Sequence, residues 1–450
     1  MSTSTATVSD KRPSAASGLY LCPGRNLRTG CEEFSTLYSG ITSLEDDMLR
    51  VAAAIYACDL AFKRGERENI TRAITLHIPV VNYHAFLGSH ERLTQILWIL
   101  SHDSWKITFS RMNGAPEGAS SWPKHDGATI LFSGGADSLA GAIDLLSAHS
   151  IDGVQLASHV TANSVTRTSQ DDLASYLEKK FGGPLRRVAI RTGGRNLPGF
   201  PFPVDFDREE TQRTRSFMYL AIAALGARRS GHSKIIEIAE NGQMAIHLPL
   251  SAARIGAFST HTAHPEFLQE AAAFFGDVLD FPFVITNPFL YETKAQVIGR
   301  VITQHRAALP MSVSCWRSSR LGTQFRHCGE CVPCLVRRIA FEHNGLSLPE
   351  YARDLLAEKV GSLDEQDEGK RNLVELVEFA FAFGTMPEAR LEQIFPELTN
   401  PAVDKSMAIA LYRRFAAEAQ GVLRRYPGPA ALFPPSTKTA RARSRKKGTK

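Results

Sequence analysis

A six-residue segment, Ser-Gly-Gly-Ala-Asp-Ser at positions 133–138, is the feature that most restricts how this chain can fold. It lies between the apolar run ATILF and the stretch SLAGAIDLL, which predict a buried strand and a helix. Two consecutive glycines allow a tight, partly left-handed backbone whose N–H groups converge on an anion, and the following helix adds its positive end. The segment therefore predicts a phosphate-binding loop.

Each residue type in this loop suits a phosphate ligand. The hydroxyl groups of Ser133 and Ser138 can donate hydrogen bonds to phosphate oxygens. Asp137 has the same charge sign as phosphate, so we expect it to organise the loop or to help hold Mg²⁺. The loop is not a Walker A motif, because no Gly-Lys-Ser/Thr follows the glycines. A glycine turn without a ligand is the alternative interpretation. The predicted nucleotide-binding residues are Ser133, Gly134, Gly135, Ala136, Asp137 and Ser138.

The surrounding sequence predicts an α/β fold with a doubly wound parallel sheet. From residue 128 short apolar strands alternate with amphipathic helices, which is typical of a parallel sheet covered on both faces. Loops at the carboxyl ends of such strands form the ligand crevice. The predicted organisation is a disordered leader (1–17), an N-terminal α/β domain (18–120), a catalytic domain (121–347), a helical accessory domain (348–434) and a basic disordered tail (435–450).

The net charge of +6 comes from the end of the chain. Residues 436–450 contain seven basic residues and no acidic one, so the rest is close to neutral. We expect the tail to be disordered and to offer weak contact with nucleic-acid phosphates. No apolar run approaches the roughly 20 residues of a membrane span, and the first residues do not resemble a secretory signal. We therefore expect a cytoplasmic protein without membrane contact.

Four of the seven cysteines lie close together, as C-x12-C-x2-C-x2-C. The tight C-x2-C-x2-C turn can present three thiolates to one tetrahedral ion, and a fourth sulfur closes the shell. A closed four-sulfur shell predicts a structural Zn²⁺ ion. An iron–sulfur cluster is the chemical competitor, and four unrelated buried thiols are the third possibility. The predicted ligands are Cys315, Cys328, Cys331 and Cys334.

The loop resembles the signature of the PP-loop, or ATP-pyrophosphatase, superfamily, and it matches at every defined position. This resemblance implies an adenine nucleotide α-hydrolase-like fold and ATP as a substrate. It also implies chemistry at the α-phosphate: the second substrate is adenylylated, pyrophosphate leaves, and a nucleophile then displaces AMP.

A closer resemblance is to the 7-cyano-7-deazaguanine synthases, over about residues 128–345. It rests on the four-cysteine site, on a P-x4-TK element formed by Pro288, Thr293 and Lys294, and on Arg215 at the start of a long apolar helix. With Ser133 and Asp137, the resemblance gives Arg215 and Lys294 as catalytic candidates. Lys294 would offset charge on the departing pyrophosphate, and a solvated lysine at a helix start is the alternative.

Two further groups are candidates for substrate binding. Glu240 and Asn241 follow the predicted strand KIIEIA, where a carboxylate and an amide can read the edge of a guanine-like base. A simple turn is the alternative, because Asn-Gly is a common turn pair. Thr260, His261 and His264 form a polar cluster in which a histidine can serve as a proton shuttle or phosphate contact, although a lone histidine is more often structural.

The family resemblance implies an ATP-dependent ligase that adenylylates a 7-carboxy-7-deazaguanine-like carboxylate and transfers the acyl group to nitrogen. The added flanking regions, and the segments AENGQMAIHLPLS and RIGAFSTHTAHPEF, resemble elongated synthase-like proteins of bacterial anti-phage systems of the Qat type. That favours an amide with a partner protein encoded nearby. The alternatives are free nitrile synthesis in queuosine-type biosynthesis, tRNA modification, and a nucleotide-binding scaffold without turnover.

Overall fold

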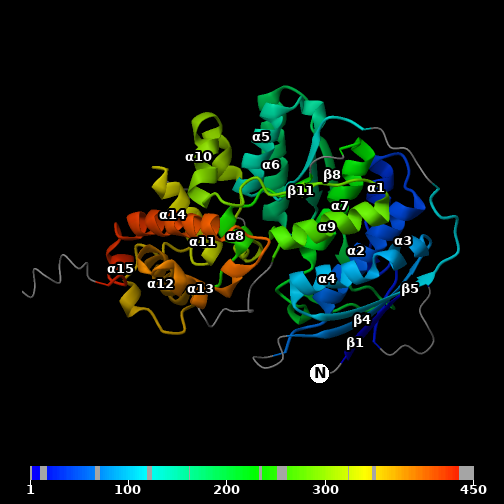
Figure 1. Cartoon of the computed structure of the whole chain (residues 1–450), viewed down its shortest axis with the longest axis horizontal. Helices are drawn as coiled ribbons and strands as arrows, with labels where there is room; N and C mark the ends of the chain where they lie inside the picture. The colour runs from blue at the N-terminus through cyan, green and yellow to red at the C-terminus, as the bar shows by residue number, and fades with distance from the viewer. Residues whose placement is uncertain are drawn as a thin grey trace, which may run out of the picture.

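The computed structural model describes residues 3–10, 18–65, 71–118, 124–161, 163–232, 236–250, 261–322, 324–346 and 351–434. Of the predicted features, Thr260, the tail and residues 1–2 and 11–17 of the leader lie outside these ranges. Figure 1 shows three regions side by side: the N-terminal sheet at the lower right, the second sheet in the centre, and the C-terminal helices at the left.

The N-terminal region is a four-stranded parallel sheet in the order β2-β1-β4-β5. Its strands are β1 (Thr3–Val8), β2 (Leu19–Leu21), β4 (Ala73–Val80) and β5 (Ser104–Arg111). Helices α2 (Ser43–Ala61), α3 (Tyr83–Gly88) and α4 (His90–Ser101) accompany them. The prediction of a disordered leader over 1–17 is wrong for Thr3–Val8. Ala6 and Val8 are buried there, and the strand pairs with two neighbours.

The central sheet is parallel throughout and has the order β11-β10-β6-β7-β8. Its strands are β6 (Ala128–Leu131), β7 (Val154–His159), β8 (Arg186–Ile190), β10 (Ile236–Glu237) and β11 (Ile285–Thr286). One face is covered by α5 (Ala136–Ala148), α6 (Ser164–Phe181) and α10 (Lys294–His305), the other by α7 (Arg215–Ser230) and α9 (Pro265–Leu279). The predicted α/β, doubly wound fold class is therefore confirmed.

The strand order fixes where a ligand can bind. After β6 the chain adds β7 and β8 on one side, whereas β10 and β11 lie on the other side. The loops that leave β6 and β10 therefore diverge, and such a divergence opens a crevice at the carboxyl edge of a parallel sheet. The loop after β6 is the segment 133–138, and the loop after β10 carries Glu240 and Asn241.

The predicted helical region after residue 348 is also present. It consists of α12 (Glu368–Thr385), α13 (Glu388–Ile394), α14 (Lys405–Leu423) and α15 (Pro427–Ala430). An aromatic core that includes Phe379, Phe383 and Tyr412 holds these helices together. They also pack on α8 (Gly242–Ile246) and α11 (Val332–His343) of the central region.

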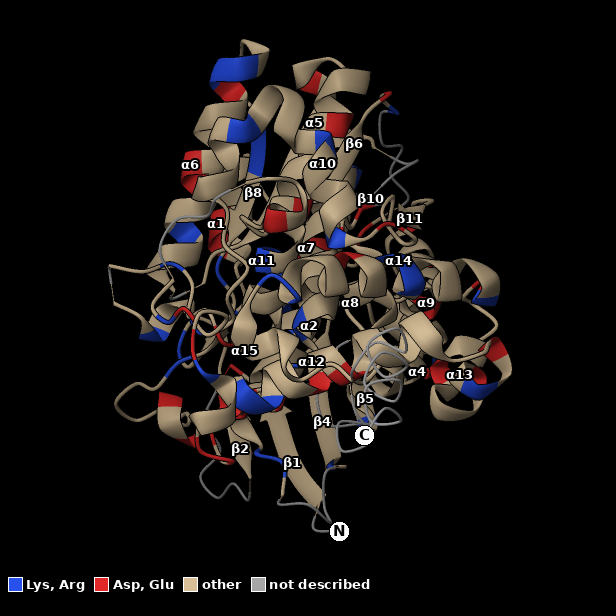
Figure 2. Cartoon of the chain, turned by 90° about the vertical axis from the view of Figure 1, so that its left-hand side faces the viewer, with Lys and Arg blue, Asp and Glu red and all other residues tan. Residues whose placement is uncertain are grey.

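Short elements complete the description. Helix α1 (Cys31–Leu37) packs near β8, and strands β3 (Leu27–Arg28) and β9 (Gly193–Gly194) form an antiparallel pair between the first two regions. In the part of the chain that the structure describes, no helix combines the length and apolar character needed to cross a bilayer. Figure 2 shows basic and acidic residues interspersed over the side that it presents.

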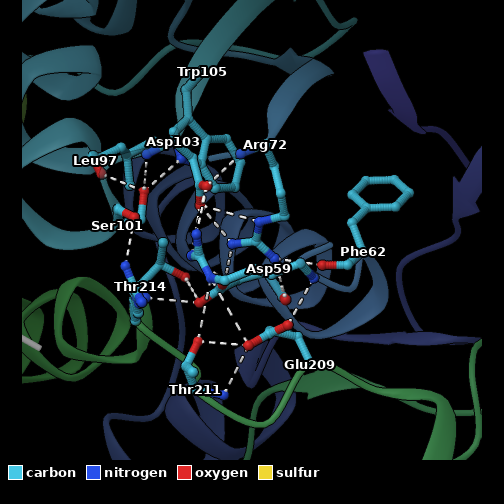
Figure 3. A network of polar contacts seen from close by, with 12 residues as sticks. Asp59, Phe62, Arg72, Leu97, Ser101, Asp103, Trp105, Glu209, Thr211 and Thr214 are labelled. Carbon is cyan, nitrogen blue, oxygen red and sulfur yellow. Dashed lines mark hydrogen bonds and ion pairs between the residues drawn. The ribbon is translucent and has the colours of Figure 1, made fainter. Parts of the chain in front are cut away.

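A buried ionic network joins the N-terminal region to the central sheet (Figure 3). The side chains of Asp59 and Asp103 are fully buried, and Arg72 Nη2 lies 2.5 Å from Asp59 Oδ1 and 2.6 Å from Asp103 Oδ2. Arg64 binds both oxygens of Asp103 at 2.7 Å. Asp59 Oδ2 accepts hydrogen bonds from the backbone N–H and the hydroxyl of Thr214, at 2.8 and 3.0 Å. Because Thr214 is the N-cap of α7, a carboxylate of α2 holds the start of that helix.

Replacing Asp59 is expected to destabilise the protein strongly. Asp59→Ala leaves Arg72 buried with one carboxylate fewer, and breaking a buried pair from one side costs about 3–5 kcal/mol. The matched control is Arg187→Ala, which breaks an ion pair with Asp171 at the surface and should cost less than about 1 kcal/mol. Urea denaturation followed by circular dichroism measures both. Equal midpoints for the two variants would contradict the role given to the network.

Candidate functional site

The glycine loop after β6 has the geometry expected of an anion site. Gly134 has φ of 81°, which favours glycine, and a Cβ there would lie only 3.1 Å from the backbone nitrogen of Gln170. Gly135 is the N-cap of α5 and provides no side-chain cap for the first turn of the helix. The hydroxyl groups of Ser133 and Ser138 lie 3.2 Å apart. The loop thus directs two hydroxyl groups and a helix N-terminus to one place.

Asp137 connects this loop to two segments that are distant in sequence. Lys294 Nζ lies 2.8 Å from Asp137 Oδ2, and Asn241 Nδ2 donates a hydrogen bond to the same oxygen at 2.9 Å. Both charged side chains are well buried, with 13% exposure for Asp137 and 8% for Lys294. The strand order therefore brings together three of the residues that the sequence selected. They form one polar cluster at the divergence between β6 and β10.

Buried polar atoms without partners lie within and beside this cluster. Among the described residues, Asp137 Oδ1, Glu240 Oε2, Asn241 Oδ1 and Gln243 Nε2 are all buried and have no hydrogen-bond partner. Such atoms cost free energy unless a partner satisfies them, and each needs an explanation. Three acceptors and one amide donor are thus available to a ligand.

Glu240, which lies beside this cluster, has a strongly raised pKa. Burial, and next the charge of Asp137, raise the pKa of Glu240 to about 7, against the opposing effect of Lys294 and Arg215. Its backbone is fixed by Asn287, which accepts from Glu240 N at 3.2 Å and donates to Glu240 O at 2.8 Å. The carboxyl group can therefore change its protonation state near neutral pH, which is typical of functional sites.

Arg215 lies near this cluster but does not bind it directly. It is the first residue of α7, and its guanidinium carbon lies 5.6 Å from the centre of the Tyr219 ring. The side chain of Arg215 is exposed, and its charge acts on Glu240. A cation in this position is available to an anionic ligand.

The two described histidines of the predicted polar cluster lie elsewhere. His264 is the N-cap of α9, where its Nδ1 accepts from Glu266 N at 3.3 Å. The ring of His261 packs on His264 and on His102, with centroids 5.0 and 5.8 Å apart, and burial lowers the pKa of His261 to about 3. These contacts link both histidines to α4 and α9. Their role in substrate binding stays a prediction, as does that of Thr260.

Several supporting residues were not singled out from the sequence. Gly134 O accepts hydrogen bonds from Val313 N at 2.9 Å and from Ser169 Oγ at 2.7 Å. Arg337, which is fully buried in α11, donates to Ser312 Oγ at 2.9 Å and to Leu309 O at 3.0 Å. The chain around Val313 is therefore held by the glycine loop through Gly134 and by α11 through Arg337. Of the supporting residues, only Asn287 could have been predicted from the sequence, because it directly follows a strand at the carboxyl edge of the sheet.

The four cysteines converge as predicted. Their sulfur atoms all lie within 4.8 Å of one another and are buried, with Cys328 Sγ 3.8 Å from Cys334 Sγ and Cys331 Sγ 4.0 Å from Cys315 Sγ. Four thiolates bound to one Zn²⁺ at about 2.3 Å would lie about 3.8 Å apart, so the spacing suits a metal ion. Cys331 is the N-cap of α11, two turns before Arg337. The cluster is thus joined to the segment that supports the glycine loop.

Known proteins show similarity to part of this chain. Residues 215–345 match the model of a family described as queuosine biosynthesis protein QueC. The 7-cyano-7-deazaguanine synthase of Brucella ovis is 25% identical over 236 residues, which cover 50% of this chain and 93% of that protein. The synthase of Sinorhizobium fredii is 26% identical over 236 residues, 50% of this chain and 91% of that protein.

The matched segment holds much of the site. It begins at Arg215 and includes Glu240, Lys294 and all four cysteines, whereas the glycine loop precedes it. The family match and the distant synthase relatives together support a relationship between this region of the chain and the QueC-like PP-loop enzymes.

Proposed function

We propose that this protein is an ATP-dependent enzyme that activates the carboxylate of a 7-carboxy-7-deazaguanine-like substrate and joins the acyl group to nitrogen. The main observation behind this proposal is the Asp137–Lys294–Asn241 cluster beside the glycine loop. Buried polar atoms in and beside the cluster lack partners that a ligand would supply. The similarity to 7-cyano-7-deazaguanine synthases supports this choice of substrate.

The reaction has two steps. A carboxylate oxygen of the substrate attacks the α-phosphorus of ATP, the bond to the β-phosphate oxygen breaks, and pyrophosphate leaves. An amine nitrogen then attacks the acyl carbon, the bond to AMP breaks, and the amine loses a proton. Ser133, Ser138 and the N-terminus of α5 would hold the phosphates, because their hydroxyl and N–H groups donate to oxygen.

Lys294 would serve the first step, in which negative charge develops on the pyrophosphate. Its ammonium group is already fixed on Asp137 at the edge of the loop, so little reorganisation is needed. The free oxygen of Asp137 would be available to Mg²⁺, which binds ATP phosphates and prefers carboxylate ligands. Arg215 would supply a second cation near the bound substrate.

Glu240, Asn241 and Gln243 would recognise the base. A carboxylate accepts hydrogen bonds from the ring N–H and amino groups of a guanine-like edge, and the two amides supply a further acceptor and a donor. The three unpartnered atoms of these residues offer this combination of two acceptors and one donor. His261, His264 and Thr260 remain candidates for more distant contacts.

The nitrogen acceptor is proposed to be an amine of a partner protein encoded nearby, in bacterial anti-phage defence. Half of this chain lies outside the match to the synthases, and the described flanking regions are folded units that a small acceptor such as ammonia would not require. Ammonia as acceptor, and after a second activation the free nitrile, is the alternative. Intact-mass measurement of the co-expressed partner separates the two: an unchanged mass with nitrile formed from ammonia rejects conjugation.

Removing either member of the Asp137–Lys294 pair is expected to abolish turnover. Asp137→Asn and Lys294→Ala should each lower the release of AMP and pyrophosphate from ATP and the deazaguanine acid by about 100-fold or more. The matched control is Asp144→Asn on the same helix, whose half-exposed carboxylate pairs with Arg300. Wild-type rates in both variants, or no AMP from the wild-type enzyme, would reject the proposed function.

The affinity for the base is expected to rise as the pH increases through about 7. Below the pKa of Glu240 the group is a neutral acid, and above it the carboxylate can accept from the N–H groups of the base. The pH profile of kcat/KM should show this step. Glu240→Gln should remove the step and lower kcat/KM roughly ten- to a hundredfold, as expected for about 1.5–3 kcal/mol from a charged hydrogen bond.

Glu237→Gln is the control for this pH dependence. Burial, followed by the charge of Asp144, also raises the pKa of Glu237 to about 7, but that residue lies within β10 rather than beside Asp137. Its replacement should leave the step in place. A profile that loses the step in Glu237→Gln and keeps it in Glu240→Gln would overturn the assignment.

The cysteine cluster is proposed to hold one Zn²⁺ per chain, bound by Cys315, Cys328, Cys331 and Cys334. Bound zinc would contribute folding free energy directly, because it would tie the loop around Cys315 to the start of α11. Cys328→Ser with Cys331→Ser should therefore lose the metal and lower the thermal midpoint. Elemental analysis measures the zinc content, and iron with a visible charge-transfer band would instead support a cluster.

A further inference from the structure

The C-terminal helical region makes direct contact with the segment that carries Lys294. Helix α14 packs against α8 and α11, as Figure 1 shows at the left of the molecule. Its residue Glu418 is 8% exposed, and Glu418 Oε1 accepts a hydrogen bond from Thr293 Oγ1 at 2.7 Å. Thr293 immediately precedes Lys294 and is itself fully buried. A carboxylate from the added region therefore reaches the residue next to the predicted catalytic lysine.

Thr293 fixes the direction in which Lys294 enters α10. It is the N-cap of that helix and forms a capping box with Gln296, with bonds of 3.1 and 2.9 Å. The threonine hydroxyl accepts from Gln296 N, so its single proton is free to bind Glu418. Burial raises the pKa of Glu418 to about 7, opposed by the bond from Thr293 and the charge of Arg414.

A second contact from α14 reaches Lys294 through Gln243 of α8. Lys294 N donates to Gln243 Oε1 at 2.6 Å, and the backbone carbonyl of Gln243 accepts from the Tyr412 hydroxyl at 3.3 Å. The same hydroxyl accepts from Leu248 N at 3.2 Å. Tyr412 is 2% exposed, so its position is fixed by packing. Helix α14 thus contacts Thr293 directly and reaches the backbone N–H of Lys294 through Gln243.

Tyr291, three positions before Lys294, is also held by α14 and its N-cap. Arg414 Nη2 donates to Tyr291 O at 2.7 Å, and Asp404 N donates to the Tyr291 hydroxyl at 2.8 Å. Contacts with Tyr291, Thr293 and Gln243 all come from α14 or its N-cap. Thr293 directly precedes Lys294, Gln243 accepts from its backbone N–H, and Tyr291 is three positions before it. Four polar contacts from α14 and its N-cap thus bear on the chain around Lys294.

We infer that the C-terminal helical region is part of the catalytic apparatus, in which Glu418 and Tyr412 are positioning residues that hold Lys294 against Asp137 of the phosphate loop. This inference rests on the proposed function of Lys294, and it gives the C-terminal helices the role of positioning that lysine. A displacement of about 1 Å at a reacting group can lower a rate on the order of a hundredfold, so loss of these contacts should be visible in kcat.

The test uses the full-length protein with Glu418→Ala and Glu418→Gln. Gln keeps an oxygen that can accept from Thr293, so it should retain turnover within about threefold, whereas Ala should lower kcat by about 10- to 100-fold with less change in KM. The matched control is Gln420→Ala on the same helix, whose amide donates to Ala380 O at 3.0 Å in α12. Its kcat should equal that of the wild type.

A second measurement needs no substrate. Brief labelling with acetic anhydride, read by peptide mass spectrometry, reports how accessible the Lys294 amine is. Glu418→Ala should increase its labelling severalfold relative to other lysines, and Gln420→Ala should not. If wild-type protein fails to release AMP, the proposed function fails, but this labelling still decides whether α14 positions the lysine.

Two outcomes would overturn the inference. One is wild-type labelling of Lys294 in Glu418→Ala, and the other is an equal increase in Gln420→Ala, which would indicate general loosening. Should Glu418→Ala not fold, Tyr412→Phe removes only the second contact and decides through the same labelling. Increased labelling of Lys294 in that variant supports the inference, and wild-type labelling rejects it.

Discussion

The buried carboxylate of Asp59 determines how the two α/β layers fit together. Taking such a charge out of water is costly, and the cost is offset only when partners satisfy both of its oxygens. Here Arg72 binds one oxygen and Thr214 the other. Because Thr214 begins α7, and α7 covers one face of the central sheet, the network fixes that face against α2. The N-terminal region is therefore an integral layer of the molecule, and its core continues into the central one.

The geometry of the candidate site depends on the strand order of the central sheet. The glycine loop and the cysteine spacing could be predicted because each is a local pattern whose residue types have a direct physical meaning. The pair between Asp137 and Lys294 could not, since the residues are far apart in sequence and are brought together only by the placement of β10 and β11 beside β6 and by the packing of α10 on α5. Glu418 and Asp59 were missed for the same reason: isolated acidic residues in helices carry no sign of a buried partner.

Two details of the sequence could have been interpreted better. The leader contains TSTATV, whose β-branched residues at alternate positions favour a strand, but its small polar residues suggested disorder. His264 directly precedes a proline, and a polar residue before a proline is typical of a helix start. The structure accordingly gives its ring a capping bond. In both cases the local pattern of residues was a better guide to the backbone structure than the amino-acid composition of the segment.

The cysteine cluster is linked to the glycine loop through a very short stretch of chain at Val313, so the proposed metal would affect how the purified protein behaves. Val313, which binds the carbonyl of Gly134, is only two positions before Cys315. Loss of the proposed metal would remove one anchor of that segment, the other being Arg337, and would disturb the shape of the loop. Partly loaded material would then behave as a mixture of competent and inert molecules. Its apparent kcat would follow the metal content, while its KM would stay that of the loaded fraction.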